Sequence, residues 1–258
     1  MNEDTLIAVC GYAGDAKQIT NALPFYLHHE RPVLVLSPTD SPIGPKNRAA
    51  QTKVLFRSAG KRAYVGQLSL DRQRDHLKLM LEYPHEWILA NDSDSVCVDP
   101  KIPEYLYQDK TVLWSNEVSD MMHDRSDDPG YIFPRLAFQP PYFFHRSVAE
   151  KLVSIADSVP ANTRTPFIDW CMMAWAIAAD IPHRNFIDGV SCPTAHYPPG
   201  QQAMADGVRN RGATMLHSIK TADVLYQMVS HRIEYKRVNK IPITSARVLV
   251  GLQKGRNG

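Results

Sequence analysis

Residues 6–36, LIAVCGYAGDAKQITNALPFYLHHERPVLVL, contain one complete strand-helix-strand unit. Two short apolar runs, residues 6–10 and 33–36, are typical of strands that are buried on both faces of a parallel sheet. Between them, Asp15 can cap a helix whose apolar residues recur at helical spacing and which ends before Pro32. This order predicts a right-handed βαβ unit and therefore an α/β fold.

The residues that follow lead to an acidic turn at the end of another strand. Residues 37–62 are rich in Pro, Gly and basic residues and predict a loop with some helix. Residues 70–83 carry apolar side chains mainly on one face, so we expect a helix there, stopped at Pro84. Residues 87–90, WILA, predict a buried strand, which ends in the turn 91–95, NDSDS. Open α/β sheets bind their ligands at such strand ends.

The second half of the chain predicts further strands and helices in alternation. Residues 111–114 form a strand candidate, 115–130 a polar loop and 140–144 an extended apolar segment. Ser147 and Glu150 have the spacing of a capping box that opens a helix. The remaining expected elements are an apolar helix over 168–179, a loop with a short strand over 186–199, and a helix over 222–233.

The composition favours a single α/β domain. The chain has 258 residues, of which 44% are hydrophobic and 22% charged, which excludes a disordered, collagen-like or disulfide-stapled protein. We expect one domain over residues 1–220, followed by a C-terminal helix and basic tail over 221–258. The four cysteines lack paired spacing, so we interpret them as reduced and mostly buried.

The net charge of +2 hides an uneven distribution. Residues 231–258 contain seven Lys or Arg against one Glu, a net charge of +6, so the other 230 residues carry −4. The start of the chain lacks the features of a signal peptide, and no stretch is apolar enough to span a membrane. We therefore expect a soluble, cytoplasmic protein, whose oligomeric state the sequence leaves open.

The clearest chemical motif is Asp92-Ser93-Asp94 at the end of its strand. Two carboxylates two residues apart can converge on one hard divalent cation, and Mg²⁺ or Mn²⁺ uses one or two protein carboxylates while binding substrate phosphates. The other interpretation is a polar turn in which Asp and Ser side chains cap backbone groups. Position alone does not separate the two.

The order of these features resembles glycosyltransferases of the A-type fold. The resemblance covers residues 5–220 and is most specific at the strand that ends in Asp92-Ser93-Asp94. It implies a mostly parallel, Rossmann-type sheet flanked by helices. It also implies that Asp92 and Asp94 bind Mn²⁺ or Mg²⁺ on the diphosphate of a nucleotide sugar such as a UDP-sugar, with Ser93 beside the donor.

Three phrases look like glycosyltransferases encoded by bacteriophages, some of which lie with genes for DNA base modification. They are CGYAGD at 10–15, YVGQLSLDRQ at 64–73 and QPPYF at 139–143. The resemblance implies the host cytoplasm as the location. Together with the basic segments, it favours a hydroxymethylated base in phage DNA as the sugar acceptor. A hydroxyl of a virion protein or of a polysaccharide remains the alternative.

The same resemblance assigns further residues to the donor site. Tyr12 is expected to stack on the base, and Gly11 to let the backbone approach it. Asp40 lies where such folds contact base or ribose, and Arg62 can pair with a phosphate. Each has an ordinary alternative: a strand-to-helix turn for residues 11–14, a turn residue for Asp40 and a solvated charge for Arg62.

The late part of the chain supplies the remaining candidates. His217 and Lys220 resemble a histidine that completes the metal shell and a lysine that holds the diphosphate, although the longer signature of the best-known retaining group is absent. Asp169, in the first turn of its expected helix, is the candidate base that deprotonates the acceptor in an inverting reaction, and Asp188 is the reserve.

Two other functions compete. Asp92-Ser-Asp-Ser-Val96 matches the Asp-x-Asp-x-Val pattern of haloacid-dehalogenase-like phosphatases, but that motif belongs on the first strand of its domain. A non-enzymatic nucleic-acid-binding protein fits the basic segments, but no DNA-binding motif is present. A dinucleotide oxidoreductase is disfavoured more strongly, because residues 11–14 lack the three-glycine fingerprint.

Overall fold

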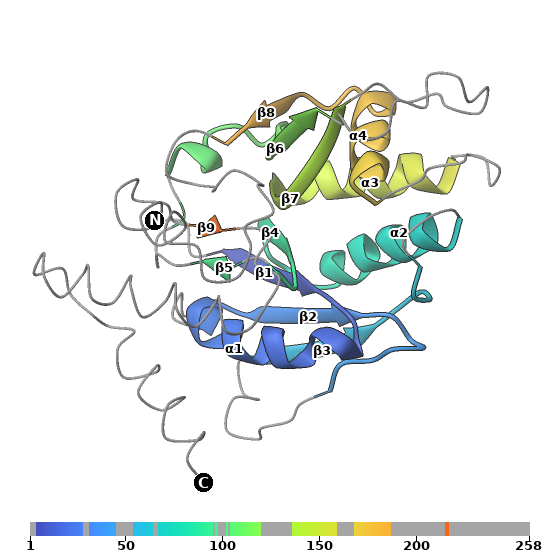
Figure 1. Ribbon diagram of the computed structural model, residues 1–258. Coiled ribbons are helices and arrows are strands. Elements are labelled where there is room, and N and C mark those ends of the chain that lie inside the picture. Colours follow the sequence, from blue (N-terminus) through green and yellow to red (C-terminus); the bar gives the residue numbers. More distant parts are fainter. Residues whose placement is uncertain are drawn as a thin grey trace, which may run out of the picture.

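The computed structural model describes residues 4–27, 31–44, 54–63, 67–94, 96–97, 102, 104–119, 136–158, 168–186 and 215–216. These residues contain a seven-stranded sheet in the order β3-β2-β1-β4-β7-β6-β8 (Figure 1). Its strands are β1 Thr5–Cys10, β2 Val33–Ser37, β3 Val54–Ser58, β4 Trp87–Asp92, β6 Leu113–Ser119, β7 Leu136–His145 and β8 His183–Asn185. Four of the six pairings are parallel, which confirms the mostly parallel sheet.

The first strand-helix-strand unit has the predicted form. A short 3-10 helix, η1 (Ala13–Asp15), leads from β1 into α1 (Ala16–Leu27), and β2 then pairs parallel to β1 with Ile7 opposite Val33. The side chains of β1 and β2 are almost entirely buried, as continuous apolar runs in a parallel sheet require.

Helices cover both faces of the sheet. One face carries α2 (Gln67–Leu81), α3 (Arg146–Ser158) and α4 (Ile168–Ala178), which share a core with alternate strand residues such as Leu6, Leu34 and Ile88 (Figure 1). α1 is not part of that core, although its side chains Ile19 and Leu23 are also buried. The crossover through α1 runs from β1 to β2, whereas the crossover through α2 runs in the opposite direction along the sheet, from β3 back past β1 to β4. Parallel crossovers are almost always right-handed, so the two helices are expected on opposite faces.

Three expectations from the sequence need correction. The predicted loop at 37–62 contains β3. β3 is an edge strand with several exposed residues, so it lacks the continuous apolar run that predicts a buried strand. The predicted loop at 115–130 is strand up to Ser119. α3 begins at Arg146, so Ser147 and Glu150 are not a capping box. Ser147 instead hydrogen-bonds His145, and Glu150 accepts from the Arg146 side chain at 3.0 Å.

The extended segment predicted at 140–144 is part of β7, which runs antiparallel to both β4 and β6. A separate two-stranded sheet pairs β5 (Val96–Cys97) with β9 (Met215–Leu216), and a second 3-10 helix, η3, spans Glu104–Tyr107. Within the described ranges, no helix has the length and apolarity needed to cross a membrane. The helix predicted at 222–233 and the domain boundary at 220 lie outside the described residues.

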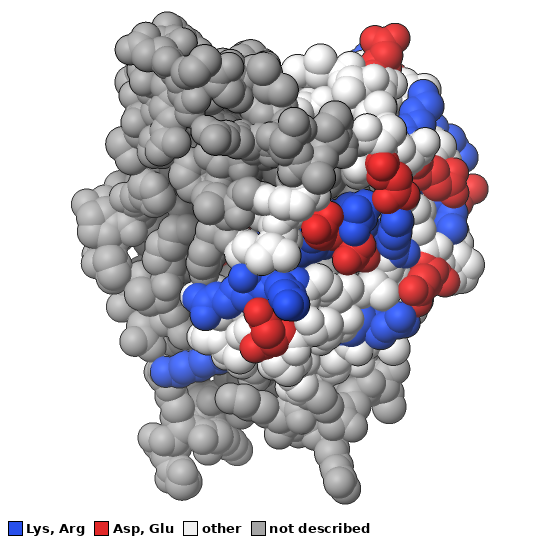
Figure 2. Space-filling view, turned by 90° about the vertical axis from the view of Figure 1, so that its right-hand side faces the viewer, with Lys and Arg blue, Asp and Glu red and all other residues white. Residues whose placement is uncertain are grey.

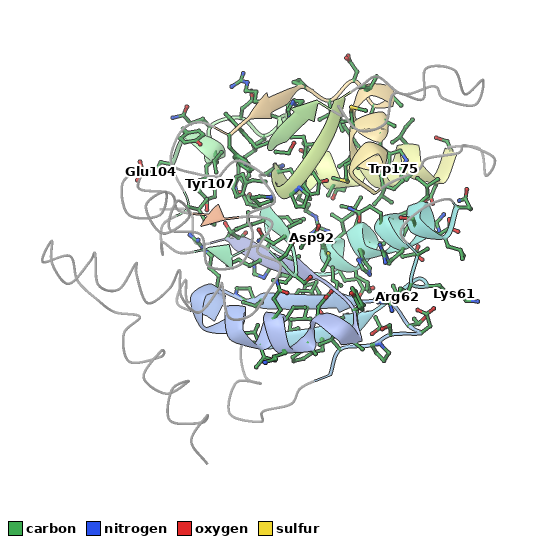
Figure 3. All side chains as sticks on the ribbon, viewed as in Figure 1. Lys61, Arg62, Asp92, Glu104, Tyr107 and Trp175 are labelled. Atoms are coloured by element: carbon green, nitrogen blue, oxygen red, sulfur yellow. The ribbon has the colours of Figure 1, made fainter. Side chains whose placement is uncertain are left out.

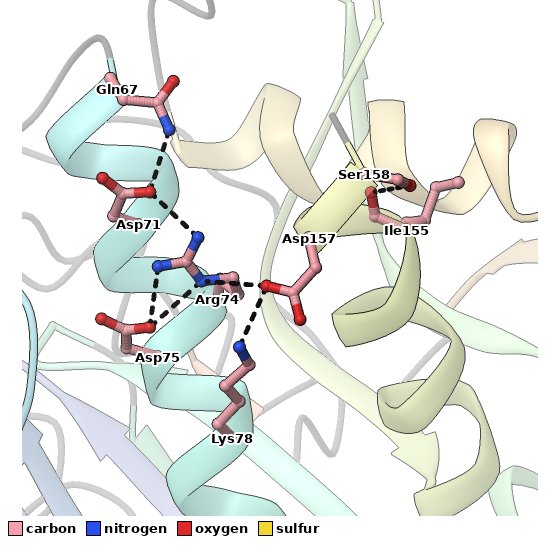
Figure 4. Close-up of polar contacts among 8 residues, drawn as sticks. All are labelled: Gln67, Asp71, Arg74, Asp75, Lys78, Ile155, Asp157 and Ser158. Atoms are coloured by element: carbon pink, nitrogen blue, oxygen red, sulfur yellow. Dashed lines mark hydrogen bonds and ion pairs between the residues drawn. The ribbon is translucent and has the colours of Figure 1, made fainter. Parts of the chain in front are cut away.

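An ion-pair network ties α2 to α3 (Figure 4). The Arg74 guanidinium lies 3.2 Å from Asp71, 3.1 Å from Asp75 and 3.6 Å from Asp157, and Lys78 lies 3.0 Å from the same Asp157 oxygen. These side chains are one quarter to one half exposed, so each pair adds little stability. The network places two cations among three carboxylates where the two helices meet.

Candidate active site

The candidate site lies where the parallel strands end. Cys10, the last residue of β1, pairs with Asp92, the last residue of β4. The loop over residues 11–15 and the turn over 93–94 therefore leave the sheet side by side. On the other side of β1, Cys10 pairs with Leu36 of β2, and the Gly11 N–H donates to the Leu36 carbonyl at 3.0 Å.

The acidic motif is partly buried at this edge. Asp92, Ser93 and Asp94 each keep some exposure to solvent. Beside Asp92, the free thiol of Cys10 has its pKa raised to about 12, first by burial and then by the negative charge of Asp92, while Arg72 acts in the opposite direction. This thiol is therefore protonated at neutral pH and is not a nucleophile.

Gly11 is fitted closely between the two loops. A Cβ atom at this position would lie 2.7 Å from Ile19 Cδ1, 3.2 Å from Asp15 Oδ2 and 3.2 Å from Ser93 Cβ. Ile19 is 1% exposed and cannot retreat easily. A side chain at residue 11 would thus fill the space next to the acidic turn, which explains the glycine.

Tyr12 carries an arginine on its ring. The Arg62 Cζ atom lies 3.9 Å from the centroid of the Tyr12 ring, a cation–π contact. A Cβ at Gly14 would come within 2.5 Å of Tyr12 Cε2, so the ring also contacts the backbone of residue 14. The residue expected to stack on a base thus already stacks with the residue expected to hold a phosphate.

Asp40 joins the same group. Its Oδ1 accepts a hydrogen bond of 2.7 Å from the Arg62 backbone N–H. Just before Arg62, Gly60 has φ +65°, and a Cβ there would lie 2.7 Å from the Arg72 Cα, so only glycine fits this turn. The loops after β1, β2 and β3 therefore meet through Tyr12, Asp40 and Arg62.

Figure 3 shows Asp92 near the centre of the molecule, with Arg62 on the loop below it and Lys61 pointing outward. Of the candidate residues, the structure thus gathers seven at one edge of the sheet. They are Gly11, Tyr12, Asp40, Arg62, Asp92, Ser93 and Asp94.

Two charged residues of this region have no functional role predicted from the sequence, although Asp15 lies in the phrase CGYAGD and Arg72 in YVGQLSLDRQ. The sequence predicts only a helix cap for Asp15, but its carboxylate accepts hydrogen bonds from the Tyr12 N–H at 3.1 Å and from the Ser93 hydroxyl. Arg72 lies on α2 and acts electrostatically on both the Cys10 thiol and the buried His76. Neither residue type is unusual in a helix or helix start, so the two phrases do not by themselves reveal these contacts.

The donor atoms at the acidic turn fit a hard divalent cation. Carboxylate oxygens are the ligands that Mg²⁺ and Mn²⁺ prefer, and Asp92 and Asp94 supply them within one turn. Within the described ranges, no three His, Cys, Asp or Glu residues form a group able to hold a metal. The third predicted ligand, His217, lies outside those ranges, but its neighbour Leu216 pairs with Val96, two residues beyond Asp94.

The remaining candidates are described only in part. Asp169 is in the first turn of α4, as predicted, although only its backbone is described. Asp188 and Lys220 lie outside the described residues.

The face in Figure 2, the right-hand side of Figure 1, mixes both signs of charge. Among the coloured residues, Asp and Glu lie between the Lys and Arg side chains rather than apart from them. The described part of this face therefore presents no uniformly positive surface.

Comparison with solved structures identifies proteins with a similar fold. No protein-family model matches the chain, and no curated protein sequence matches it. Among solved structures, the galactosyltransferase LgtC, in complex with donor and acceptor sugar analogues, matches with a TM-score of 0.52 over 87% of this chain and 95% of that chain, at 10% identity.

Two further matches are weaker. An active-site mutant of LgtC matches with a TM-score of 0.49 at 11% identity, over 87% of this chain and 95% of that chain. A glycosyltransferase involved in the glycosylation of the major capsid of PBCV-1 matches with a TM-score of 0.45 at 12% identity, over 88% of this chain and 98% of that chain. The first LgtC match confirms the predicted A-type glycosyltransferase fold.

Proposed function

We propose that the protein is a glycosyltransferase that moves a sugar from a nucleotide-diphospho-sugar, such as a UDP-sugar, to an acceptor hydroxyl. The observation that carries this proposal is the pairing of Cys10 with Asp92. It brings the glycine loop of β1 beside the acidic turn of β4, within the fold of LgtC. Ligands of open α/β sheets bind at such strand ends.

Asp92 and Asp94 are the proposed metal ligands, with His217 as the third. A bound Mn²⁺ or Mg²⁺ would neutralise negative charge on the diphosphate. Lys220 and Arg62 would add positive charge there, since the leaving diphosphate gains charge as the sugar departs. The arrival of β9 beside β5 supports His217, because Leu216 pairs with Val96.

The nucleoside would lie against the loops after β1, β2 and β3. Gly11 would let the backbone approach it, Tyr12 would offer an aromatic surface, and Asp40 would hold the loop of Arg62 through its hydrogen bond. A base that stacks on Tyr12 would share the ring with the Arg62 guanidinium or displace it. A displaced guanidinium would be able to bind phosphate.

Asp169 is the proposed base for an inverting reaction, with Asp188 in reserve. The start of a helix favours the ionised carboxylate that can accept the acceptor's proton. A retaining reaction would not need this step. The phosphatase alternative gains no support, because Asp92 lies on β4 rather than on the first strand.

For the acceptor, we propose first a hydroxymethylated base in DNA. The support is the basic content of residues 46–62 and 231–258, because phosphate contacts made by Lys and Arg supply much of DNA affinity. The described surface of Figure 2 adds nothing to it. A virion protein or a polysaccharide is the alternative acceptor.

Mass spectrometry after incubation with several UDP-sugars tests the acceptor. The substrates are hydroxymethylated DNA, the same DNA unmodified, a virion protein extract and a polysaccharide. We expect a hexose-sized mass increase on the hydroxymethylated DNA only, with a rate that falls as salt rises. Sugar found on protein or polysaccharide instead would contradict DNA as the acceptor. It would still support the proposed glycosyltransferase activity.

A further inference from the structure

Asp15 stands between the two loops of the candidate site. One carboxylate oxygen, Oδ2, accepts the Tyr12 N–H at 3.1 Å, while the Asp15 N–H donates to the Tyr12 carbonyl at 2.8 Å. The same carboxylate accepts the hydroxyl of Ser93 in the acidic turn. A single side chain thus hydrogen-bonds the loop that follows β1 and the turn that follows β4.

The space around this carboxylate is closely filled. The position of a Cβ on Gly11 lies 3.2 Å from Asp15 Oδ2 and 3.2 Å from Ser93 Cβ, so both side chains border the space beside the bare Cα of Gly11. Burial and the nearby Asp94 raise the pKa of the Asp15 carboxyl, while the Tyr12 and Ser93 hydrogen bonds and Arg62 lower it. The carboxylate is therefore half-buried close to Asp94 and Arg62.

A third loop reaches the same point through Arg62. Its guanidinium lies on the Tyr12 ring at 3.9 Å and acts electrostatically on Asp15. The loops that carry the proposed base contact, the proposed phosphate contact and the proposed metal ligands therefore converge on one carboxylate. Asp15 is the third residue of a capping box that opens at Tyr12, and that local role needs only the hydrogen bond from the Tyr12 N–H.

We propose that Asp15 is a positioning residue that ties the glycine loop after β1 to the turn Asp92–Asp94, so that the nucleoside side and the metal side of the site form as one unit. The metal part of this inference rests on the proposed function; the link between the loops does not. Removing a residue that orients metal ligands without touching the ion typically weakens metal binding by roughly 10- to 100-fold.

Four single variants distinguish a role of Asp15 in orienting the two loops from a role of its negative charge. Asp15→Ala removes both hydrogen bonds, and Ser93→Ala removes only the link to the turn. Asp15→Asn keeps an acceptor for the Tyr12 N–H and a partner for Ser93 but loses the charge. Ser41→Ala is the matched control, because Ser41 Oγ, in the loop after β2, accepts the N–H of Ala13 in the glycine loop at 3.1 Å.

The first measurement is Mn²⁺ affinity of the full-length protein by electron paramagnetic resonance, without donor. We expect Asp15→Ala and Ser93→Ala to weaken binding by roughly 10-fold or more. Asp15→Asn should stay within about 3-fold of the wild type, and so should Ser41→Ala. The double variant Asp15→Ala/Ser93→Ala should be no weaker than Asp15→Ala, because both changes break one link. An Asp15→Asn variant as weak as Asp15→Ala would show that the charge matters, and would overturn the positioning role.

The second measurement needs no metal. Amide hydrogen exchange of the metal-free protein should be at least several-fold faster in Asp15→Ala at Tyr12 and also at Ser93 and Asp94. Faster exchange at Tyr12 alone would mean that Asp15 is only a local cap, which overturns the proposal. If the wild type binds no Mn²⁺, the proposed metal site fails, and the exchange at residues 93–94 still decides the link between the loops.

Discussion

At the scale of single residues, the site depends on how closely its loops fit together. Gly11 and Gly60 both lie where a Cβ would meet an atom at 2.7 Å, in one case the side chain of Ile19 and in the other the backbone of Arg72. These contacts explain two glycines of the site by packing and backbone conformation. They also make a direct test possible.

Gly11→Ala should destabilise the protein by about 1–3 kcal/mol, because the new methyl group overpacks against Ile19. Urea unfolding followed by circular dichroism measures the change. Gly44→Ala is the matched control, since nothing lies within 4 Å of its Cβ position. Equal stability of the two variants would contradict the packing described at Gly11.

Arg62→Ala should raise the KM for the sugar donor roughly 10-fold with little change in kcat, the effect of a lost charged hydrogen bond. Arg62→Lys should not restore the KM, because an ammonium group does not stack on Tyr12 as a planar guanidinium does. Steady-state kinetics with Lys61→Ala as control measures this. An Arg62→Lys enzyme with the wild-type KM would argue for a simple charge effect.

At the scale of elements, α2 is joined to the ends of β2 and β3 by a buried histidine. His76 is 2% exposed, and hydrogen bonds to the backbone of Ser37 and Ala59 partly offset the effects of burial and of Arg72 on its pKa. Burial and then the Arg72 charge lower that pKa from 6.5 to about 4. The histidine is therefore neutral in the folded protein near neutral pH.

This burial predicts a loss of stability in mild acid. Above pH 6.5, His76 is neutral in both folded and unfolded states and has no effect on the pH dependence. Between pH 6.5 and about 4 only the unfolded state binds the proton, so the free energy of unfolding should fall by up to about 1.4 kcal/mol per pH unit. His183, whose pKa burial also lowers to about 4, acts in the same direction.

Urea unfolding at several pH values checks this, with His76→Gln as the comparison. The variant should be less stable than the wild type at neutral pH, but its stability should fall less steeply with acid. A residual slope from His183 should remain. An unchanged slope in His76→Gln would show that this histidine does not titrate differently in the two states.

The elements also show what a sequence reveals and what it does not. β1, β2 and β4 are predictable because strands buried on both faces form continuous apolar runs. β3 is an edge strand with Arg57 and Ser58 exposed, so its composition resembles a loop. The antiparallel direction of β7 depends on its partners β4 and β6, which local sequence does not encode.

The same difference holds in the candidate site. Asp92 and Asp94 can be selected because they follow a recognisable strand, and strand ends gather at one edge. The contact of Arg62 with Tyr12 joins loops about 50 residues apart in sequence, and the bond from Ser93 to Asp15 spans about 80. Such long-range pairs carry no local pattern, so the links made by Asp15 and Arg72 emerge only from the folded chain.

At the scale of the whole molecule, the order of elements and one acidic turn are enough to predict the fold. The match to LgtC at 10% identity confirms it, because strand order and crossovers persist where sequence does not. Fold alone does not define the reaction. The central claim is therefore that Asp92 and Asp94 use a divalent metal to act on a nucleotide sugar.

The most direct test is release of UDP from a panel of UDP-sugars by the purified full-length protein. We predict turnover with Mn²⁺ that EDTA abolishes and added Mn²⁺ restores. Asp92→Asn should reduce it roughly 100-fold or more, whereas Asp75→Asn, a change in the α2 network, should leave it near the wild-type rate. Turnover that neither EDTA nor Asp92→Asn affects would contradict the account.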